Sequence, residues 1–319
     1  MPSSISTSFI QQFSSNIYNL AQQKGSRLRG SVRNEMIKGD SGYFERLGSA
    51  TAQEKSGQHS DMPLLDITHT RNRLSLTDFE WASLVDTEDK LKLLIDPVSA
   101  YSQAAMWALG RSMDDVLIAA MLGNAHRGSA GATNTALTAG QHIGAVAGGA
   151  LSGLNVATLR EVKRIFDAND VDESIPRHIA VTSVELKALL GQTEVVSHDY
   201  ANVKALVQGQ VDTFLGFKFH RLERLPTNSS PYRASSSFVA SIDTTTGAVT
   251  LSTGNGNSLR RCVAWAEDGV LLGLGAEPRG SVDRRVDKSG IPWQASALMS
   301  IGAERLEEAK VVCIVTSLT

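Results

Sequence analysis

The clearest pattern of hydrophobic and polar positions predicts one long helix over residues 97–122. Asp96 is a favourable N-cap, Pro97 suits the first helical position, and Gly123 is a typical stop signal. Such a helix would be about 39 Å long, at about 1.5 Å per residue. Its last turns are apolar all round, which indicates a helix lying across a sheet with a second layer over its end. The expected apolar stripe is Val98, Ala105, Leu109, Met113, Val116 and Ala120, and the opposite polar stripe is Gln103, Trp107, Gly110, Arg111 and Asp114.

The segment before this helix has two further patterns. Residues 8–22 place Phe9, Phe13 and Ile17 on one helical stripe, which predicts a short amphipathic helix that needs a surface to lie on. Residues 42–85 alternate with a short period around a polar tip, which predicts two strands in a long hairpin with polar residues on both faces. A two-stranded ribbon without an apolar face is marginal alone, so we expect its stability to come from another molecule.

After residue 123 the chain reads as a mixed α+β region. A glycine-rich irregular segment, 123–155, is followed by shorter helices and strands and by a hairpin-rich stretch from 235 to 263. Ser183 is the expected cap of one short helix, and Gly191 its stop. The predicted helices are NVATLREVKRIFDAND, SVELKALLGQ and HDYANVKALVQG, and the predicted strands are RHIAVT, LGFKFHRL and several within 279–316.

Composition narrows the possible partners. The formal net charge of -2 gives no overall attraction to nucleic acid, so any DNA contact must be local. The segment 24–38 carries five basic residues against one acidic residue, which indicates either a solvated linker or an arm that binds a neighbouring chain or packaged nucleic acid. Within it, the candidate contacts to DNA or to a neighbour are Lys24, Arg27, Arg29 and Arg33.

Two other features concern compartment and redox state. Cys262 and Cys313 each lie in an apolar run, typical of reduced, buried thiols in a cytosolic protein. The N-terminus has no secretory signal pattern, so we expect the protein to stay in the cytoplasm. The uncharged stretch from Gly128 to Leu159 consists mostly of small and polar residues, which argues against a membrane span.

The search for chemistry predicts no catalytic residue, no metal ligand and no cofactor. GLGAEPRG has Pro278 where a dinucleotide-binding fingerprint needs its third glycine. The acidic run DANDVDE has Val171 at a position where a calcium loop needs a ligand. The only dense polar cluster is His69 with its neighbours Asp66, Arg71 and Arg73. It falls on a polar ribbon without apolar walls, which favours salt bridges over acid–base chemistry.

The order of these parts resembles the major capsid proteins of tailed bacteriophages, the Hong Kong 97 type of shell subunit. VDTEDKLKLLIDPVSAYSQAAMWALGRSMDDVLIAAMLG resembles the family's spine helix and its approach. LREVKRIFDANDVDESIPRHIAVTSVELKALLGQ resembles part of its axial domain, FLGFKFHRLERLP the strand leaving that domain, and EDGVLLGLG with KVVCIVTS its closing segment. The resemblance implies an N-terminal arm at 1–41, an extended loop at 42–82, a peripheral domain at 83–135 and 225–319, and an axial domain at 136–224.

The resemblance implies a structural protein that self-assembles as pentamers and hexamers into an icosahedral virion shell around double-stranded DNA. Assembly would take place in the bacterial cytoplasm, with separate scaffolding and portal proteins, a decoration protein as a possible partner, and no membrane. The 226–262 stretch is longer than the family core requires and is interpreted as an added surface hairpin. The candidate residues for contacts between subunits are Phe9, Phe13, Ile17, Arg46, Lys55, His69, Arg71, Arg73, Trp107 and Arg111.

Two alternatives stay open at the level of sequence. One is an encapsulin-type compartment, which shares the fold but encloses cargo enzymes. The other is an α+β enzyme with a site built around His69 or the glycine-rich segment. Copurifying cargo would favour the first, and a small-ligand activity that depends on His69 would favour the second.

Overall fold

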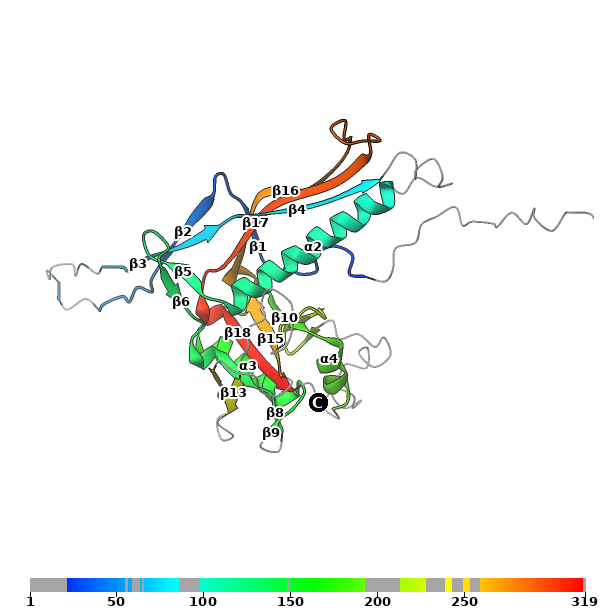
Figure 1. The fold of residues 1–319 in the computed structure, drawn as a ribbon. Coiled ribbons are helices and arrows are strands. Elements are labelled where there is room, and N and C mark those ends of the chain that lie inside the picture. The colour runs from blue at the N-terminus through cyan, green and yellow to red at the C-terminus, as the bar shows by residue number, and fades with distance from the viewer. Residues whose placement is uncertain are drawn as a thin grey trace, which may run out of the picture. The chain divides into compact units, whose positions relative to one another are not determined.

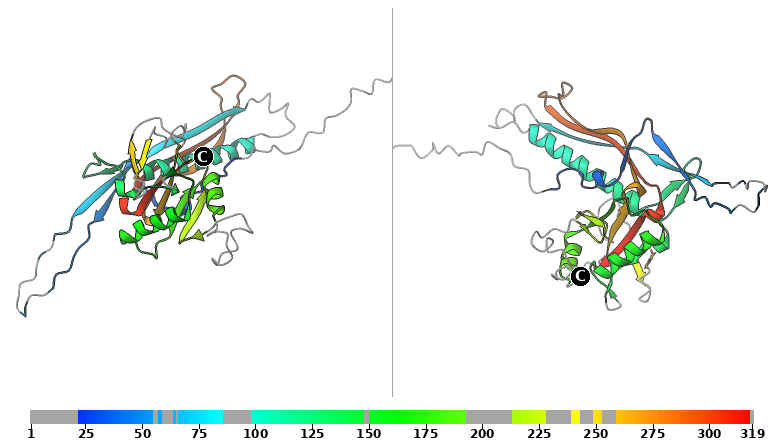
Figure 2. Two further views of the ribbon diagram at one scale, coloured as in Figure 1. Left: turned by 90° about the horizontal axis from the view of Figure 1, so that it is seen from below. Right: turned by 180° about the vertical axis from the view of Figure 1, so that it is seen from behind.

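The computed structural model describes residues 22–54, 57–58, 64, 66–85, 98–147, 150–192, 213–227, 239–242, 249–252 and 259–317. The chain divides into two units (Figures 1 and 2). Unit 1 comprises Met1–Ser26, Asp78–Ser112 and Ala276–Ser300, and unit 2 comprises Arg27–Thr77, Met113–Gly275 and Ile301–Thr319. One helix and two long strands contribute residues to both units.

Unit 1 is built from the long helix and the outer parts of long strands. The helix is α2 (Val98–Leu122), and the strands are β4 (Thr77–Val85), β16 (Val270–Arg284) and β17 (Trp293–Arg305). The three strands pair with β1 (Arg33–Met36) in a sheet of order β1-β16-β17-β4. In β17 every second residue from Ala295 to Ile301 is buried, the period expected of a strand with one face covered. The first half of α2 runs alongside these strands in all views.

Unit 2 contains a six-stranded sheet of order β11-β12-β10-β15-β18-β7. β10 pairs in parallel with β12 and antiparallel with β15, and β15 pairs antiparallel with β18. Helix α3 (Val156–Ala168) packs on this sheet, with Phe166 and Phe217 ring centroids 5.9 Å apart. The strands are β7 (His142–Gly144), β10 (Arg177–Val181), β11 (Thr213–Phe214), β12 (Phe217–Arg221), β15 (Leu259–Ala266) and β18 (Val311–Ser317).

A second sheet of unit 2 carries the predicted hairpin. Its order is β2-β3-β5-β6, formed by β2 (Ser41–Leu47), β3 (His69–Ser75), β5 (Ala125–Arg127) and β6 (Thr133–Thr135). β2 and β3 pair antiparallel in register from Ser41↔Ser75 to Leu47↔His69. The expectation of a hairpin without an apolar face is wrong at its base. There Leu74 clusters with Ile37 and Leu271, and Phe44 packs against them.

The remaining elements are short. The small strands are β8 (Val146–Ala147), β9 (Ala150–Leu151), β13 (Val239–Ile242) and β14 (Val249–Ser252), and the short helices are η2 (Arg29–Ser31), η3 (Ala139–Gln141), α4 (Ser183–Leu190), η4 (Glu267–Gly269) and η5 (Glu308–Lys310). β13 and β14 form an antiparallel pair within the 226–262 stretch. Cys262 and Cys313 are buried free thiols, as predicted.

The predicted faces of α2 need correction. Val116 and Ala120 are only half-buried, whereas Gly110 and Asp114, expected on the polar stripe, are buried. Gly110 lies against the backbone of residues 25 and 26, where a Cβ atom would come within 2.5 Å of a main-chain carbon. Asp114 is buried because its carboxylate accepts the backbone N–H groups of Arg27 and Leu28 at 3.1 to 3.2 Å. Gly110 and Asp114 were assigned to the polar stripe because the helical period does not show that residues 25–28 pack against them.

The interpretation of residues 24–38 as a solvated linker is also wrong. Leu28, Ser31 and Val32 are buried, and the Ser31 carbonyl accepts the Trp265 indole N–H at 2.7 Å. β1 then pairs in parallel with β16, in register Arg33↔Leu271. A smaller correction concerns α4, whose N-cap position is Thr182 rather than Ser183. The predicted helices at 8–22, apart from residue 22, and at 198–209 lie outside the described residues, as do Phe9, Phe13, Ile17 and Lys55.

Candidate functional site

One face of the β2–β3 hairpin carries three of the described residues that the sequence marked for contacts, His69, Arg71 and Arg73. The register places Arg73 opposite Tyr43, Arg71 opposite Glu45 and His69 opposite Leu47. Cross-strand partners in an antiparallel pair project to the same side, so these six side chains form one surface. We call them the outer hairpin face. It combines three basic side chains with Tyr43 and Leu47, which are 46% and 63% exposed.

Within this face the charges are organised around Arg71. Its guanidinium forms an ion pair with Glu45 and lies 5.7 Å from the centre of the Tyr43 ring. Hydrogen bonding to Arg71 lowers the pKa of the Glu45 carboxyl below its usual value. Because both partners are solvent-exposed, the pair adds little stability, and its effect is to orient the side chains.

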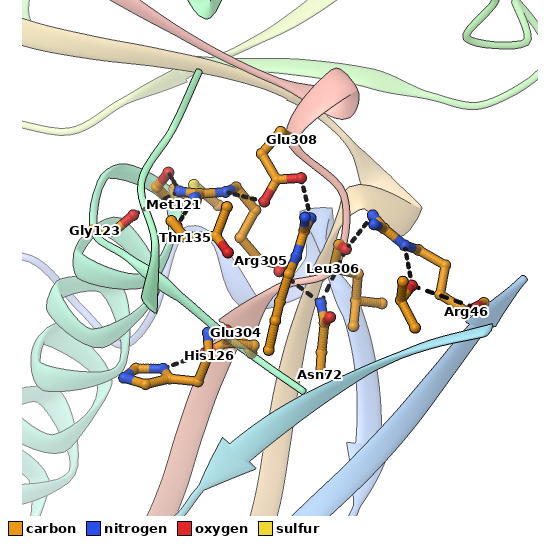
Figure 3. Close-up of polar contacts among 12 residues, drawn as sticks. Arg46, Asn72, Met121, Gly123, His126, Thr135, Glu304, Arg305, Leu306 and Glu308 are labelled. Atoms are coloured by element: carbon orange, nitrogen blue, oxygen red, sulfur yellow. Dashed lines mark hydrogen bonds and ion pairs between the residues drawn. The ribbon is translucent and has the colours of Figure 1, made fainter. Parts of the chain in front are cut away.

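The opposite face of the hairpin is anchored on the backbone that follows β17. The Arg46 guanidinium donates to the Leu306 carbonyl at 2.9 Å and to the Thr70 hydroxyl at 3.2 Å. The Asn72 side-chain amide donates to the carbonyls of Arg305 and Leu306 at 3.2 and 3.0 Å (Figure 3). Both strands of the hairpin therefore donate to the Leu306 carbonyl, and β3 also donates to the Arg305 carbonyl.

Arg305 is the centre of this anchor and is fully buried. Its guanidinium donates to the carbonyls of Met121, Gly123 and Thr135 at 2.9, 2.7 and 3.0 Å (Figure 3). Two of these carbonyls belong to the C-terminus of α2, where the last carbonyls lack helical partners and the helix dipole favours a cation. Glu308, at 3.7 Å, supplies the opposite charge. Burial lowers the pKa of Arg305 from its usual value.

One ion pair and one hydrogen-bonded carboxylate flank Arg305. Glu308 pairs with Arg127 of β5, and the buried Glu304 carboxylate accepts the backbone N–H of His126 at 2.5 Å. The second Glu304 oxygen lies 3.2 Å from the His126 imidazole. Burial raises the pKa of Glu304, and these contacts with His126 lower it again in part. The network links the hairpin, β5 and the end of α2; Glu304 and Arg305 are buried in it, whereas the His126 side chain is about half exposed.

The structure places the other candidate residues elsewhere. In unit 1, Arg111 donates to the Gln22 side chain at 2.8 Å, and Lys24 lies 5.5 Å from the centre of the Trp107 ring. In unit 2, the Arg27 guanidinium donates to the Arg221 carbonyl. Arg33 pairs with Glu35, and Arg29 is half-buried in η2. Trp107 and Arg111 thus contact residues 22–24 of their own chain.

Sequence reasoning missed the buried residues Asn72, Glu304 and Arg305. A signal for Arg305 was available, because it continues the inward alternation of β17 through Ala295, Ala297, Met299 and Ile301. A charged residue at an inward strand position needs buried partners. Asn72 and Glu304 carry no comparable signal, because their partners are backbone groups distant in sequence.

Neither metal binding nor membrane crossing is supported by the described part of the chain. It holds no group of three or more His, Cys, Asp or Glu side chains arranged to bind a metal ion. None of its helices is long and apolar enough to cross a membrane.

Several solved structures of phage capsids have a similar fold. The capsid of Helicobacter pylori bacteriophage KHP30 matches with a TM-score of 0.72 and 12% identity, over 100% of this chain and 99% of that chain. The capsid of Ralstonia phage GP4 matches with a TM-score of 0.71 and 9% identity, over 100% and 98%. The capsid of cyanophage P-SCSP1u matches with a TM-score of 0.70 and 16% identity, over 98% and 94%. The fold therefore defines the class, a mixed helix-and-strand protein of the phage capsid type.

A model of the phage capsid protein family matches residues 5–317. The match spans nearly the whole chain, and the chain belongs to this family. No curated protein matches the sequence. The chain is thus a major capsid protein, a structural protein of the virion head whose copies assemble into the shell.

Proposed function

We propose that this capsid protein assembles as pentamers and hexamers into an icosahedral shell with the Hong Kong 97 architecture, enclosing double-stranded DNA. Under this proposal residues 1–41 are the N-terminal arm and 42–82 the extended loop. Residues 83–135 and 225–319 form the peripheral domain with α2 as its spine helix, and 136–224 form the axial domain around the ring axes. Assembly takes place in the host cytoplasm with separate scaffolding and portal proteins, and a decoration protein is a possible further partner.

The outer hairpin face is the observation that supports contact between copies most directly. Tyr43 and Leu47 are exposed there, and farther along the hairpin Leu64 is 97% and Ile67 40% exposed. Four exposed apolar side chains on one two-stranded projection are unfavourable in water, because covering apolar area contributes about 25 cal/mol per Å². The hairpin is anchored by Asn72 and Arg46 on the opposite face. On the outer face Arg73 is half-buried against Gly131, whereas Tyr43 and Leu47 stay exposed. A second copy would cover this face.

The complementary surface lies in unit 1 of the neighbouring copy. A groove there is lined by the apolar side chains Phe79, Leu298 and Met299 and by two carboxylates, Asp78 and Glu80, against one cation, Arg279. The outer hairpin face offers the matching chemistry, apolar residues among basic ones. Such a contact joins two different surfaces of one chain, so repeated copies close into rings when the rotation between them permits.

The DNA contact under this proposal is local and weak. Arg27, Arg29 and Arg33 lie along the segment that leads into β1, and Lys24 precedes them. A few basic side chains per copy can neutralise phosphates. Because the net charge of the chain is close to zero, the overall electrostatic affinity for DNA stays low. The shell then encloses DNA without immobilising it.

The first experiment is expression of the full chain with the scaffolding protein of its phage, followed by light scattering and negative-stain microscopy. We expect rings or closed shells of megadalton mass. A protein that stays monomeric at high concentration in the presence of scaffold would contradict the proposal.

A matched pair of variants tests the hairpin contact. Leu47→Glu places a charge on the outer hairpin face, and we expect loss of shells with an unchanged melting temperature, because Leu47 is exposed within its own chain. Val184→Glu on α4, where Val184 is 41% exposed, is the control and should assemble normally. Equal assembly of both variants would show that the outer hairpin face does not take part in the contact between copies.

A further inference from the structure

Two histidines on neighbouring strands of the six-stranded sheet form a hydrogen-bonded pair. The Nδ1 atom of His178 on β10 lies 2.9 Å from the Nε2 atom of His220 on β12. Both imidazoles stack on the Trp265 indole of β15, with ring centroids 5.7 and 5.9 Å away. The indole N–H of Trp265 is itself held by the Ser31 carbonyl. The pair therefore sits on a rigid, buried aromatic platform.

The surroundings of the pair supply no negative charge to it. His178 is only 4% exposed, and its Nε2 atom is buried without a hydrogen-bond partner among the described residues. The Asp114 carboxylate is held by the backbone N–H groups of Arg27 and Leu28. Every charged side chain on the three strands that carry the pair and Trp265 is a cation: Arg177 on β10, Lys218 and Arg221 on β12, and Arg260 and Arg261 on β15. Arg27 lies in the segment that leads to Ser31, and α2 carries the carboxylates Asp114 and Asp115.

Hydrogen bonding between two imidazoles depends on how many protons they share. A neutral pair has one N–H donor facing one lone pair, which suits the observed 2.9 Å separation. One added proton leaves that hydrogen bond in place but puts a charge in a poorly solvated site. A second proton sets N–H against N–H at this distance, and the bond becomes repulsive.

We propose that the His178–His220 pair is a proton-sensitive latch that holds β12 on β10, closed when neutral and opened by protonation. Among the described residues, β12 is paired on its other side only with β11, which has two residues, so the histidine pair stands near the edge of the sheet. Opening would loosen β11 and β12 while leaving β15 and β18 in place. The latch belongs to the folded chain itself and does not depend on pentamers or hexamers.

The pH range follows from the direction of the pKa changes. Burial, with added repulsion from His220 and Lys218, lowers the pKa of His178 from 6.5 to about 4. Burial and Lys218 lower the pKa of His220 as well. A histidine with a depressed pKa in the folded state contributes its full stability above the unfolded pKa of 6.5. That contribution is lost as the pH falls from 6.5 toward 4, because the unfolded chain binds protons first.

The test compares the full-length protein with the double variant His178→Gln/His220→Gln, which keeps hydrogen-bonding groups and removes both titrations. Denaturant unfolding is followed by circular dichroism at about pH 7 and about pH 5. From His178 alone, the ratio of unfolded to folded protein should rise about 20-fold more in the parent than in the variant over this interval. The control is His69→Gln, which removes an exposed histidine of the hairpin and should behave as the parent.

The single variant His220→Gln covers the case in which the double variant does not fold, because His220 is only half-buried. It removes one of the two protons and should show a smaller pH response than the parent. Superimposable pH profiles of parent and variants would overturn the proposal. Stabilisation of the parent, but not of His220→Gln, by added Zn²⁺ at neutral pH would also overturn it, because the pair would then be a metal site.

Discussion

Replacing Arg305 by Met tests how much the buried contacts of Arg305 contribute to the free energy of unfolding. The variant keeps most of the side-chain volume and removes the guanidinium. The carbonyls of Met121, Gly123 and Thr135 then lose their donor in a site that solvent does not reach. Glu308 keeps Arg127 as a partner but loses its second cation.

The magnitude can be worked from these contacts. A net loss of about 1.5 to 3 kcal/mol is typical for one hydrogen bond to a charged group, and leaving buried acceptors unpaired adds to it. Against this, the variant no longer desolvates a charge, which offsets a large part of the loss. We expect the free energy of unfolding to fall by about 4 kcal/mol, within the range of 3 to 5 seen when one partner of a buried ionic contact is removed.

The measurement is urea unfolding of the full chain at neutral pH, followed by circular dichroism. Arg305→Lys should lose about 2 kcal/mol, because one ammonium keeps the charge but cannot reach three separate carbonyls. Arg164→Met is the matched control, because Arg164 is exposed on α3 and pairs only with Glu161, three residues away. Its stability should change by no more than about 0.5 kcal/mol. A loss below about 1 kcal/mol for Arg305→Met would refute the assignment of Arg305 as the anchor.

Three further predictions follow from buried contacts. Gly110→Ala should lower the melting temperature and expose residues near Gly25 to protease, because the new Cβ would meet backbone at 2.5 Å. Asp114→Asn should cost about 2 kcal/mol in urea unfolding, because a neutral amide accepts the Leu28 N–H more weakly than a carboxylate does. Cys313 should react with a thiol reagent only after denaturation, because it is buried and burial raises its pKa to about 12; rapid labelling of the native protein would contradict this.

Local patterns predicted the elements whose determinants are close in sequence. The bounds of α2 were expected at 97–122 and lie at 98–122, because an N-cap, a first-turn proline and a stop glycine mark both ends. The helix expected from NVATLREVKRIFDAND was also predicted correctly and is α3, in which Leu159 and Phe166 follow the helical period and are buried. The hairpin and its strands were visible from alternation alone.

The errors fall where a distant backbone segment decides the environment. Asp114 and Gly110 look like surface residues of a helix until residues 25–28 are placed against them. The segment 24–38 looks like a charged linker because its basic residues alternate with the buried Leu28 and Val32. Periodicity within one element carries no information about which other segment will approach it.

The strand order of the six-stranded sheet has a consequence for the timing of synthesis. β18, residues 311–317, lies between β15 and β7, although β7 is translated far earlier. Until these residues leave the ribosome, β7 lacks the strand with which it pairs in this sheet, and one edge of β15 is unpaired. Completion of the six-stranded sheet therefore waits for the synthesis of residues 311–317, long after β7 has been made.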